Sequence, residues 1–238
     1  MSKHSKWAKI KRQKGVTDVK RGVIFSKLSR NITIAAREGT DVATNFKLRM
    51  AVDRALAENM PKDNIERAIE RAAKSEDGAT LESLIIEARG PGGCALLIDV
   101  ITDNRNRSFG ELRKLLGDHA CHPTEPGSMQ WLFDRRGQIF IDNVTNLEQA
   151  ELDAIDAGAA EIDTNETMLE VITNPEQLHA ITEILRAKKY KITASELVMH
   201  PKTPIALVEN DYNKLQELME ILEDHADVAV VTTNAVPA

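Results

Sequence analysis

Cysteine and long apolar segments are both scarce in this sequence. Cys94 and Cys121 are the only cysteines among 238 residues, and no run of about 18 apolar residues is present that would cross a membrane. The N-terminal segment is positively charged but lacks the apolar stretch of a secretory signal peptide. We therefore expect free thiols, no membrane partner and a cytoplasmic location, unless the basic segment serves as an organelle presequence.

Motifs of common catalytic and nucleotide-binding sites are also missing. The sequence has no nucleophile elbow, no Walker A loop and no dinucleotide fingerprint. His119, Cys121 and His122 resemble half of a zinc site, but no second pair of ligands follows. A group of acids that suggests a metal-dependent nuclease is more typical of a solvated helix face; it comprises Asp153, Asp156, Glu161 and Asp163. We expect no enzyme activity, no metal, no cofactor and no small-molecule substrate.

Charge is distributed very unevenly along the chain, although the net charge is only −6. Residues 1–75 carry 18 Lys and Arg against 8 Asp and Glu, whereas residues 76–238 carry 13 against 29. The balance is therefore +10 in the first part and −16 in the second. This asymmetry predicts a polyanion-binding N-terminal part on an acidic body. The acidic body either serves solubility or contacts basic proteins, such as those of a ribosome.

The first third of the chain has the apolar spacing of helices. Ile24, Leu28 and Ile32 recur at helical intervals, and a Gly39 turn ends that helix. Further amphipathic helices are expected at 43–59 and from Pro61 to about residue 74, with proline in the first turn, where it is tolerated. Three helices with short connections predict a small bundle.

After residue 75 the pattern changes to strands alternating with helices. Strands are expected at 83–88 and 94–101 around the glycine-rich turn 90–93, and Ser108 with Glu111 forms a capping box that starts a helix. Strands 129–133 and 138–141 are expected to form a hairpin with Arg135 and Arg136 at its tip. Further elements are expected as helix 147–157, strands 161–162 and 168–172, helix 175–188, strand 191–198, strand 205–209, helix 212–225 and strand 227–232.

This order predicts two α+β domains, one inserted into the other. Residues 130–202 contain a complete unit, whereas 79–129 and 203–238 each supply only part of a sheet. The predicted fold class is a multidomain α+β protein with an N-terminal three-helix bundle over residues 1–78, which includes a basic arm. Two ferredoxin-like α+β domains follow it: 79–129 with 203–238, and the inserted 130–202.

Four motifs give the sequence a family resemblance that covers essentially the full chain. It resembles the YebC/PmpR family, which includes the mitochondrial translational activator of cytochrome c oxidase. The resemblance implies a helical domain followed by two nested α+β domains, and a role in gene expression. Family members have been described as DNA-binding transcriptional regulators and as translation factors that act on ribosomes stalled at proline-rich sequences. The motifs are His4-Ser5-Lys6-Trp7, Met60-Pro61-Lys62-Asp63-Asn64-Ile65, Gly90-Pro91-Gly92-Gly93 and Thr102-Asp103-Asn104-Arg105-Asn106-Arg107.

The sequence departs from the family pattern in three places. Lys3 stands where glycine is usual, the strand before Gly90 lacks the usual aromatic residue, and residues 119–123 differ from the family's glycine-rich loop. These changes affect local contacts rather than the resemblance as a whole.

The predicted nucleic-acid-binding residues lie in the arm and the first helix. Lysine and arginine neutralise phosphates, and the Trp7 indole can stack on an unpaired base. The arm has little to pack against, so it is expected to order on binding; the alternative is a solvated tail with Trp7 and Ile10 packed on the bundle. The full set is Lys3, His4, Ser5, Lys6, Trp7, Lys9, Lys11, Arg12, Lys14, Lys20, Arg21, Lys27, Arg30 and Arg37.

Secondary contacts are expected from two further groups. Asn104, Arg105 and Arg107 follow a strand, where helix capping and surface hydrogen bonds compete with a role in contacting RNA, protein or another domain. Arg135 and Arg136 would reach a polyanion from a hairpin tip. The turn 90–93 is expected to be a simple tight turn, since it lacks the lysine and the helix start of a phosphate-binding loop.

The leading hypothesis is a translation accessory factor that binds ribosomal RNA, because an arm with a stacking tryptophan suits unpaired bases. Relief of stalling at proline-rich sequences is what the resemblance adds. Three alternatives stay open. They are a DNA-binding transcriptional regulator, a protein–protein adaptor whose arm binds an acidic partner, and, more distantly, a hydrolase.

Overall fold

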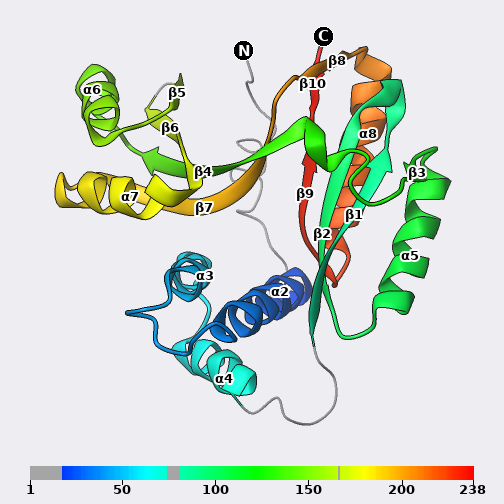
Figure 1. The fold of residues 1–238 in the computed structure, drawn as a ribbon, viewed down its shortest axis with the longest axis horizontal. Coiled ribbons are helices and arrows are strands. Elements are labelled where there is room, and N and C mark those ends of the chain that lie inside the picture. Colours follow the sequence, from blue (N-terminus) through cyan, green and yellow to red (C-terminus); the bar gives the residue numbers. More distant parts are fainter. Residues whose placement is uncertain (1–17, 74–80, 166) are drawn as a thin grey trace. The chain divides into compact units, whose positions relative to one another are not determined.

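The structure, a computed structural model, describes residues 18–73, 81–165 and 167–238. Figure 1 labels its elements and colours them along the sequence, from blue at the N-terminus to red at the C-terminus. The chain forms two compact units, one made of Met1–Phe133 with Pro201–Ala238 and the other of Asp134–His200.

The N-terminal helices are α2 (Asp18–Ala36), α3 (Phe46–Ala57) and α4 (Lys62–Ala73). Leu28 and Ile32 of α2 are buried against Leu48 of α3 and Ile65 of α4, as the apolar spacing predicts. Asn45 fixes the connection between α2 and α3. Its Oδ1 accepts from the Leu48 amide at 3.0 Å, and its Nδ2 donates to the Ala35 carbonyl at 2.8 Å. One side chain thus caps α3 and holds the end of α2.

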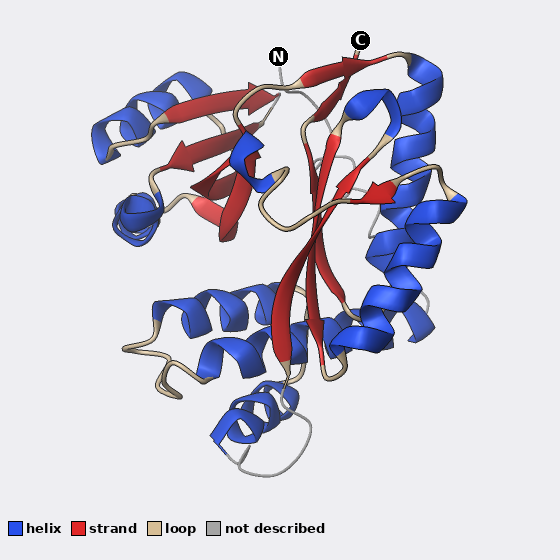
Figure 2. Ribbon diagram, turned by 45° about the vertical axis from the view of Figure 1, so that its right-hand side comes forward, coloured by secondary structure: helices blue, strands red, loops and turns tan. Residues whose placement is uncertain are grey.

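The remainder of the first unit is a sheet with helices on one side. Its strand order is β3-β1-β2-β9, and the neighbouring pairs are antiparallel; the short strands β8 and β10 pair in parallel. Figure 2 shows the strong twist of the long strands and the helices beside them. The elements are β1 (Glu82–Arg89), the 3₁₀ turn η2 (Pro91–Gly93), β2 (Ala95–Thr102), α5 (Arg105–Asp118), β3 (His122–Pro123), η3 (Gln130–Leu132), β8 (Ile205–Leu207), α8 (Glu209–Asp224), β9 (Val228–Thr233) and β10 (Ala235–Pro237).

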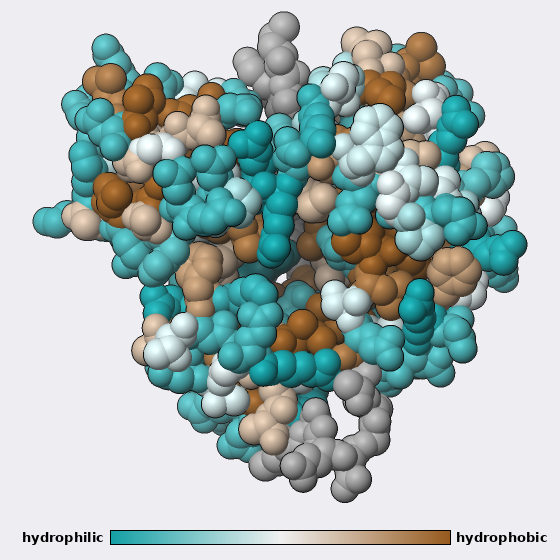
Figure 3. All heavy atoms as spheres, viewed as in Figure 1, coloured by the Kyte–Doolittle hydropathy of each residue, from teal (hydrophilic) through white to brown (hydrophobic). Residues whose placement is uncertain are grey.

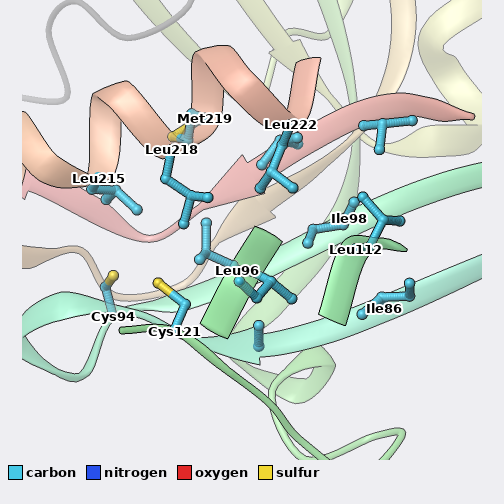
Figure 4. Close-up of a cluster of buried hydrophobic side chains, with 14 of the residues drawn as sticks. Ile86, Cys94, Leu96, Ile98, Leu112, Cys121, Leu215, Leu218, Met219 and Leu222 are labelled. Carbon is cyan, nitrogen blue, oxygen red and sulfur yellow. The ribbon is translucent and has the colours of Figure 1, made fainter. Parts of the chain in front are cut away.

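The core of this sheet lies between its strands and helices α5 and α8 (Figure 4). Leu215, Leu218 and Leu222 recur at helical spacing along α8 and point toward Leu96 and Ile98 of β2. Residues far apart in the sequence therefore share one core, and the strands before the insertion need α8 after it in order to bury their apolar face.

The second unit has the βαββαβ order of a ferredoxin-like domain. Its strand order is β5-β6-β4-β7, with β6 antiparallel to both β4 and β5. The first and last strands of the unit therefore lie side by side. The elements are β4 (Phe133–Asp142), α6 (Leu147–Ala157), β5 (Glu161–Asn165), β6 (Met168–Thr173), η4 (Pro175–Gln177), α7 (Leu178–Ala187) and β7 (Lys191–Pro201).

Two local predictions are wrong. No hairpin separates 129–133 from 138–141: η3 is a 3₁₀ turn, and β4 runs without interruption through Arg135 and Arg136. Gly137 is needed for close packing rather than for a turn, because a Cβ there would lie 2.2 Å from Thr173 Oγ1. The capping box is also wrong. Helix α5 starts at Arg105 behind the cap Asn104, and Ser108 is buried inside it.

The face of the molecule seen in Figure 3 is mainly hydrophilic, with hydrophobic residues in small separate groups. Within the described ranges, every helix is too short or too polar to span a bilayer.

Candidate nucleic-acid interface

The predicted arm residues, from Lys3 to Lys14, lie outside the described residues, as does the side chain of Lys20. The structure therefore places only four members of the predicted set: Arg21, Lys27, Arg30 and Arg37. Arg21 and Arg37 are exposed, whereas Lys27 and Arg30 are half-buried. The Arg37 guanidinium donates to the Leu81 carbonyl at 2.6 Å.

Lys27 and Arg30 of α2 contact the C-terminal end of α8 and the start of β9. Lys27 Nζ donates to the Glu223 carbonyl. Arg30 Nη1 donates to the Ala226 carbonyl at 2.9 Å and forms an ion pair with Asp227. Cations are favoured at a helix C-terminus because the last carbonyls have no partner within the helix. These two side chains thus join the helical bundle to the sheet of the same unit.

Asp227 is the centre of this junction, and its side chain is only 4% exposed. Besides Arg30, it accepts from Arg107 Nη2 at 2.8 Å and from Ser108 Oγ at 2.6 Å. Burial alone would raise the pKa of Asp227. The hydrogen bonds from Ser108, Arg107 and Arg30 outweigh burial, however, and lower the pKa to about 2. The carboxylate is charged at neutral pH and joins α2 and α5 to the start of β9.

For Lys27, burial is the dominant effect on the pKa. It lowers the pKa of the ammonium group to about 8, although Glu223 and Asp224 partly oppose the change. The Lys27 ammonium group lies among acidic neighbours and has lost part of its hydration. Lys27 and Arg30 are therefore half-buried and paired within the protein, whereas Arg21 is exposed.

The Thr102–Arg107 motif has a structural role in this junction. Asn104 Oδ1 caps α5 by accepting from the Arg107 amide at 3.1 Å, and the Asn104 amide donates to Thr102 Oγ1 at 2.9 Å. Arg107 pairs with both Asp103 and Asp227. Arg105 is exposed at the start of α5. Capping and ion pairing therefore account for Asn104 and Arg107.

Arg135 and Arg136 lie on strand β4 rather than at a hairpin tip. Arg135 is exposed, and Arg136 Nη1 donates to Asn174 Oδ1 at 3.3 Å. Arg136 also lies 3.7 Å from an Asp134 carboxylate oxygen. A regular strand fixes the direction of both side chains more tightly than a turn would.

The glycine-rich turn 90–93 closes the β1–β2 hairpin. Its amides bond within the turn, since Gly93 N donates to the Gly90 carbonyl at 3.1 Å and Cys94 N to the Pro91 carbonyl at 3.2 Å. Gly92 has a φ of 61°, and a Cβ there would lie 2.4 Å from Leu207 Cδ2. The turn is built for close packing against the C-terminal segment, not for holding phosphate.

The two thiols lie near each other in the core (Figure 4). Both cysteines are free and buried. Burial raises the pKa of Cys94 and raises that of Cys121 to about 11. Both are therefore protonated at neutral pH and poor metal ligands or nucleophiles.

Two acidic sites within the described residues are candidates for metal binding, and the acids in both have local partners. Asp153 binds Lys188 Nζ at 2.6 Å and the Tyr190 hydroxyl at 2.6 Å. Ligand atoms of Glu111, His225 and Asp227 lie within 4.8 Å of one another. Asp227, however, already receives two guanidinium groups there, and these would repel a metal ion.

The predictions made from the sequence missed two features of the structure. One is the Asp227 junction, whose partners are separated by up to 197 residues. The other is Glu87 of β1, a buried carboxylate that follows the apolar residues Leu84, Ile85 and Ile86. A charge directly after this apolar run was a usable signal, because buried charges almost always have dedicated partners.

Comparison with known proteins gives consistent matches over nearly the whole chain. The model of the TACO1/YebC protein N-terminal domain matches residues 5–75, and that of the TACO1/YebC second and third domain matches residues 81–235.

Similar proteins are known from several bacteria. The chain is 46% identical to a "Probable transcriptional regulatory protein" of Roseiflexus castenholzii, covering 98% of this chain and 94% of that one. It is 41% identical to a protein of the same name from Dictyoglomus turgidum, covering 98% and 95%. Its structure resembles a conserved hypothetical protein of Aquifex aeolicus with a TM-score of 0.90 at 33% identity, covering 98% of each chain.

Proposed function

Because this chain belongs to the TACO1/YebC family, we propose that it is a non-enzymatic regulator of gene expression that binds nucleic acid through its basic N-terminal segment. The relatives' names point to a regulatory protein. The preferred target is RNA, and we assign the protein to translation as an accessory factor that binds ribosomal RNA and relieves stalling at proline-rich sequences. We expect it to act in the cytoplasm, where Cys94 and Cys121 stay free.

The observation that carries this proposal is where the unbalanced positive charge lies. Residues 1–17 contain six Lys and Arg and no Asp or Glu, whereas residues 18–73 contain 11 against 8. In addition, Lys27 and Arg30 are engaged with the C-terminal part of the first unit. Most of the charge that can neutralise phosphate therefore belongs to the first 17 residues, beside the stacking candidate Trp7.

The acidic part of the chain supports the same assignment. Residues 142–238 hold 19 acidic and 6 basic side chains. Phosphate is repelled by such an excess of negative charge, so residues 142–238 as a whole suit a nucleic acid less well than the N-terminal part of the chain does. In this proposal, Arg21 and Arg37 make supporting contacts with phosphate. Lys27 and Arg30 instead hold α2 in place.

A second candidate is a DNA-binding transcriptional regulator, which the names of the relatives favour. The two candidates differ in the form of nucleic acid. A stacking tryptophan needs an unpaired base, whereas a transcriptional regulator contacts duplex phosphates and grooves.

Sedimentation of the full chain with purified ribosomes, with and without nuclease treatment, tests the first candidate. A parallel measurement compares its affinity for single-stranded RNA and for duplex DNA of equal length at one salt concentration. Co-sedimentation that nuclease abolishes, with tighter binding of RNA, supports translation. Binding only to duplex DNA supports transcription instead. Ribosome binding that survives nuclease treatment would point to a protein partner and overturn both candidates.

A further inference from the structure

The Glu87 carboxylate organises a loop that presents an exposed indole. This loop, residues 124–132, is called the Glu87 loop below. Glu87 is 4% exposed and accepts hydrogen bonds from the amides of Gly127, Met129 at 2.6 Å and Gln130 at 3.0 Å. Three backbone amides thus satisfy one buried charge, an arrangement that holds the loop firmly.

Trp131 is the exposed aromatic side chain of this loop. Its exposed fraction is 65%, the largest among the exposed large hydrophobic side chains of the described residues. The ring is nevertheless fixed, because its Nε1 donates to the Ser128 carbonyl at 2.8 Å. The Leu132 amide also closes a turn onto the Met129 carbonyl at 2.9 Å. A single exposed apolar side chain is common on protein surfaces, but a large ring held in one orientation on a firmly bonded loop is preorganised for a contact.

The surroundings of Trp131 suit a nucleobase better than a broad apolar protein surface. Its loop neighbours Ser128 and Gln130 are polar and exposed, so the ring is not part of a continuous apolar patch along the loop. The Lys202 amide donates to the Leu132 carbonyl at 2.9 Å, which places a cationic residue beside the turn. Arg89 is exposed two positions along β1 from Glu87, and its guanidinium lies beside Gly93 of the turn 90–93. An exposed aromatic ring, with cationic residues on the strand and segment that bond its loop, has the composition of a single-strand binding platform.

We propose that Trp131 is a stacking platform for an unpaired nucleobase, positioned by Glu87 and its loop, with Arg89 and Lys202 toward the phosphates. The proposal rests on the function proposed above. It adds a second contact in the sheet-bearing part of the first unit, apart from the N-terminal segment.

The affinity test uses the full chain and a fluorescein-labelled oligouridine of about 12 nucleotides, within the range that single-strand sites cover. Stacking on one aromatic ring is worth about 1–3 kcal/mol, so Trp131→Ala should weaken binding by about five- to 150-fold. Trp131→Phe, which keeps a ring, should recover most of the affinity. Ile155→Ala is the matched control, since it removes an exposed apolar side chain from the second unit.

A second readout follows the ring itself. Trp7 and Trp131 are the only tryptophans, so in a Trp7→Phe background all tryptophan emission comes from Trp131. Stacking of uracil on the indole should quench that emission as the oligonucleotide saturates the protein. Emission that stays constant while the label reports binding would overturn the platform, and so would equal affinities of Trp131→Ala and Ile155→Ala. In both cases RNA still binds, so the function proposed above would stand.

Loss of ribosome binding in Trp131→Ala with unchanged oligonucleotide affinity would instead assign the ring to a protein contact. That result would also overturn the nucleobase assignment. Absence of oligonucleotide binding by the unmodified protein at any salt concentration would defeat the proposed function, and the platform with it.

Discussion

Replacing Asp227 with asparagine should destabilise the first unit more than any other single exchange of one carboxylate for its amide there. The substitution keeps the shape of the side chain and a hydrogen bond to Ser108. It removes the charge that holds Arg30 of α2 and Arg107 of α5. The two guanidinium groups then lose the buried carboxylate that they share, and Arg107 keeps only its partner Asp103, while Lys27 remains nearby at the end of α8.

The magnitude follows from the pKa of the carboxyl group. Folding lowers the pKa of Asp227 from 3.8 to about 2, and each pKa unit corresponds to about 1.4 kcal/mol. The ionised form therefore contributes at most about 2.5 kcal/mol at neutral pH. Arg107 is 43% exposed, so water screens part of its attraction. We expect Asp227→Asn to lower the free energy of unfolding by about 2 kcal/mol.

Urea unfolding of the full chain, followed by circular dichroism, measures this loss. Asp118→Asn, at the exposed end of α5, is the matched control and should change stability by less than about 0.5 kcal/mol. The folded-state pKa is depressed, so the stabilisation is present above pH of about 4 and disappears as the pH falls through about 2. The difference between the unmodified protein and Asp227→Asn should shrink over that interval. Equal stability of Asp227→Asn and Asp118→Asn at pH 7 would refute the reasoning.

Two further predictions concern the same unit. Folding lowers the pKa of Lys27 from 10.5 to about 8, so stability should rise with pH between these values, and Lys27→Met should remove that part of the rise. Urea midpoints of both proteins at pH 8 and pH 10 check this, and a parallel rise in the variant would contradict it. Gly92→Ala should cost about 1–3 kcal/mol because of its φ of 61° and the approach to Leu207. Gly110→Ala, at a helical position with nothing within 4 Å, should instead stabilise by up to about 1 kcal/mol. Thermal unfolding should show a lower unfolding temperature for Gly92→Ala and a higher one for Gly110→Ala than for the unmodified protein, if the turn geometry is the cause.

The fold class was predictable because periodic apolar residues dominate the long elements. The helical spacing of Leu28 and Ile32 gave α2, and the apolar runs beside the turn 90–93 gave β1 and β2. The predictions failed where a residue's role depends on a distant partner. Ser108 has the local pattern of a helix cap, yet its hydroxyl binds Asp227, 119 residues away. Gly137 has the local pattern of a turn, yet it exists to make room for Thr173 and Leu178.

The candidate site shows the same division between local and distant information. The concentration of positive charge is readable from the sequence. Whether a given cation faces solvent or another part of the chain is not readable from helical spacing alone. Lys27 and Arg30 fall on the polar side of α2, opposite the side that packs in the bundle, and that polar side meets α8 and β9. The sequence of α2 therefore predicts only its apolar side to be buried. The second buried side is formed by cations, and their partners lie nearly 200 residues away.

The salt dependence of RNA binding tests the central claim most directly, because counterion release reports how many phosphates the protein neutralises. The variant Lys6→Ala, Lys9→Ala, Lys11→Ala removes three charges of the N-terminal segment and none of the described contacts. The control Lys114→Ala, Lys189→Ala, Lys214→Ala removes three exposed lysines elsewhere, so the net charge changes equally. The slope of log K against log salt for single-stranded RNA should fall in magnitude by about 2 in the first variant, at roughly 0.7 per contact, and stay constant in the control. An unchanged slope in the first variant, or an equal change in both, would contradict binding by the basic N-terminal segment.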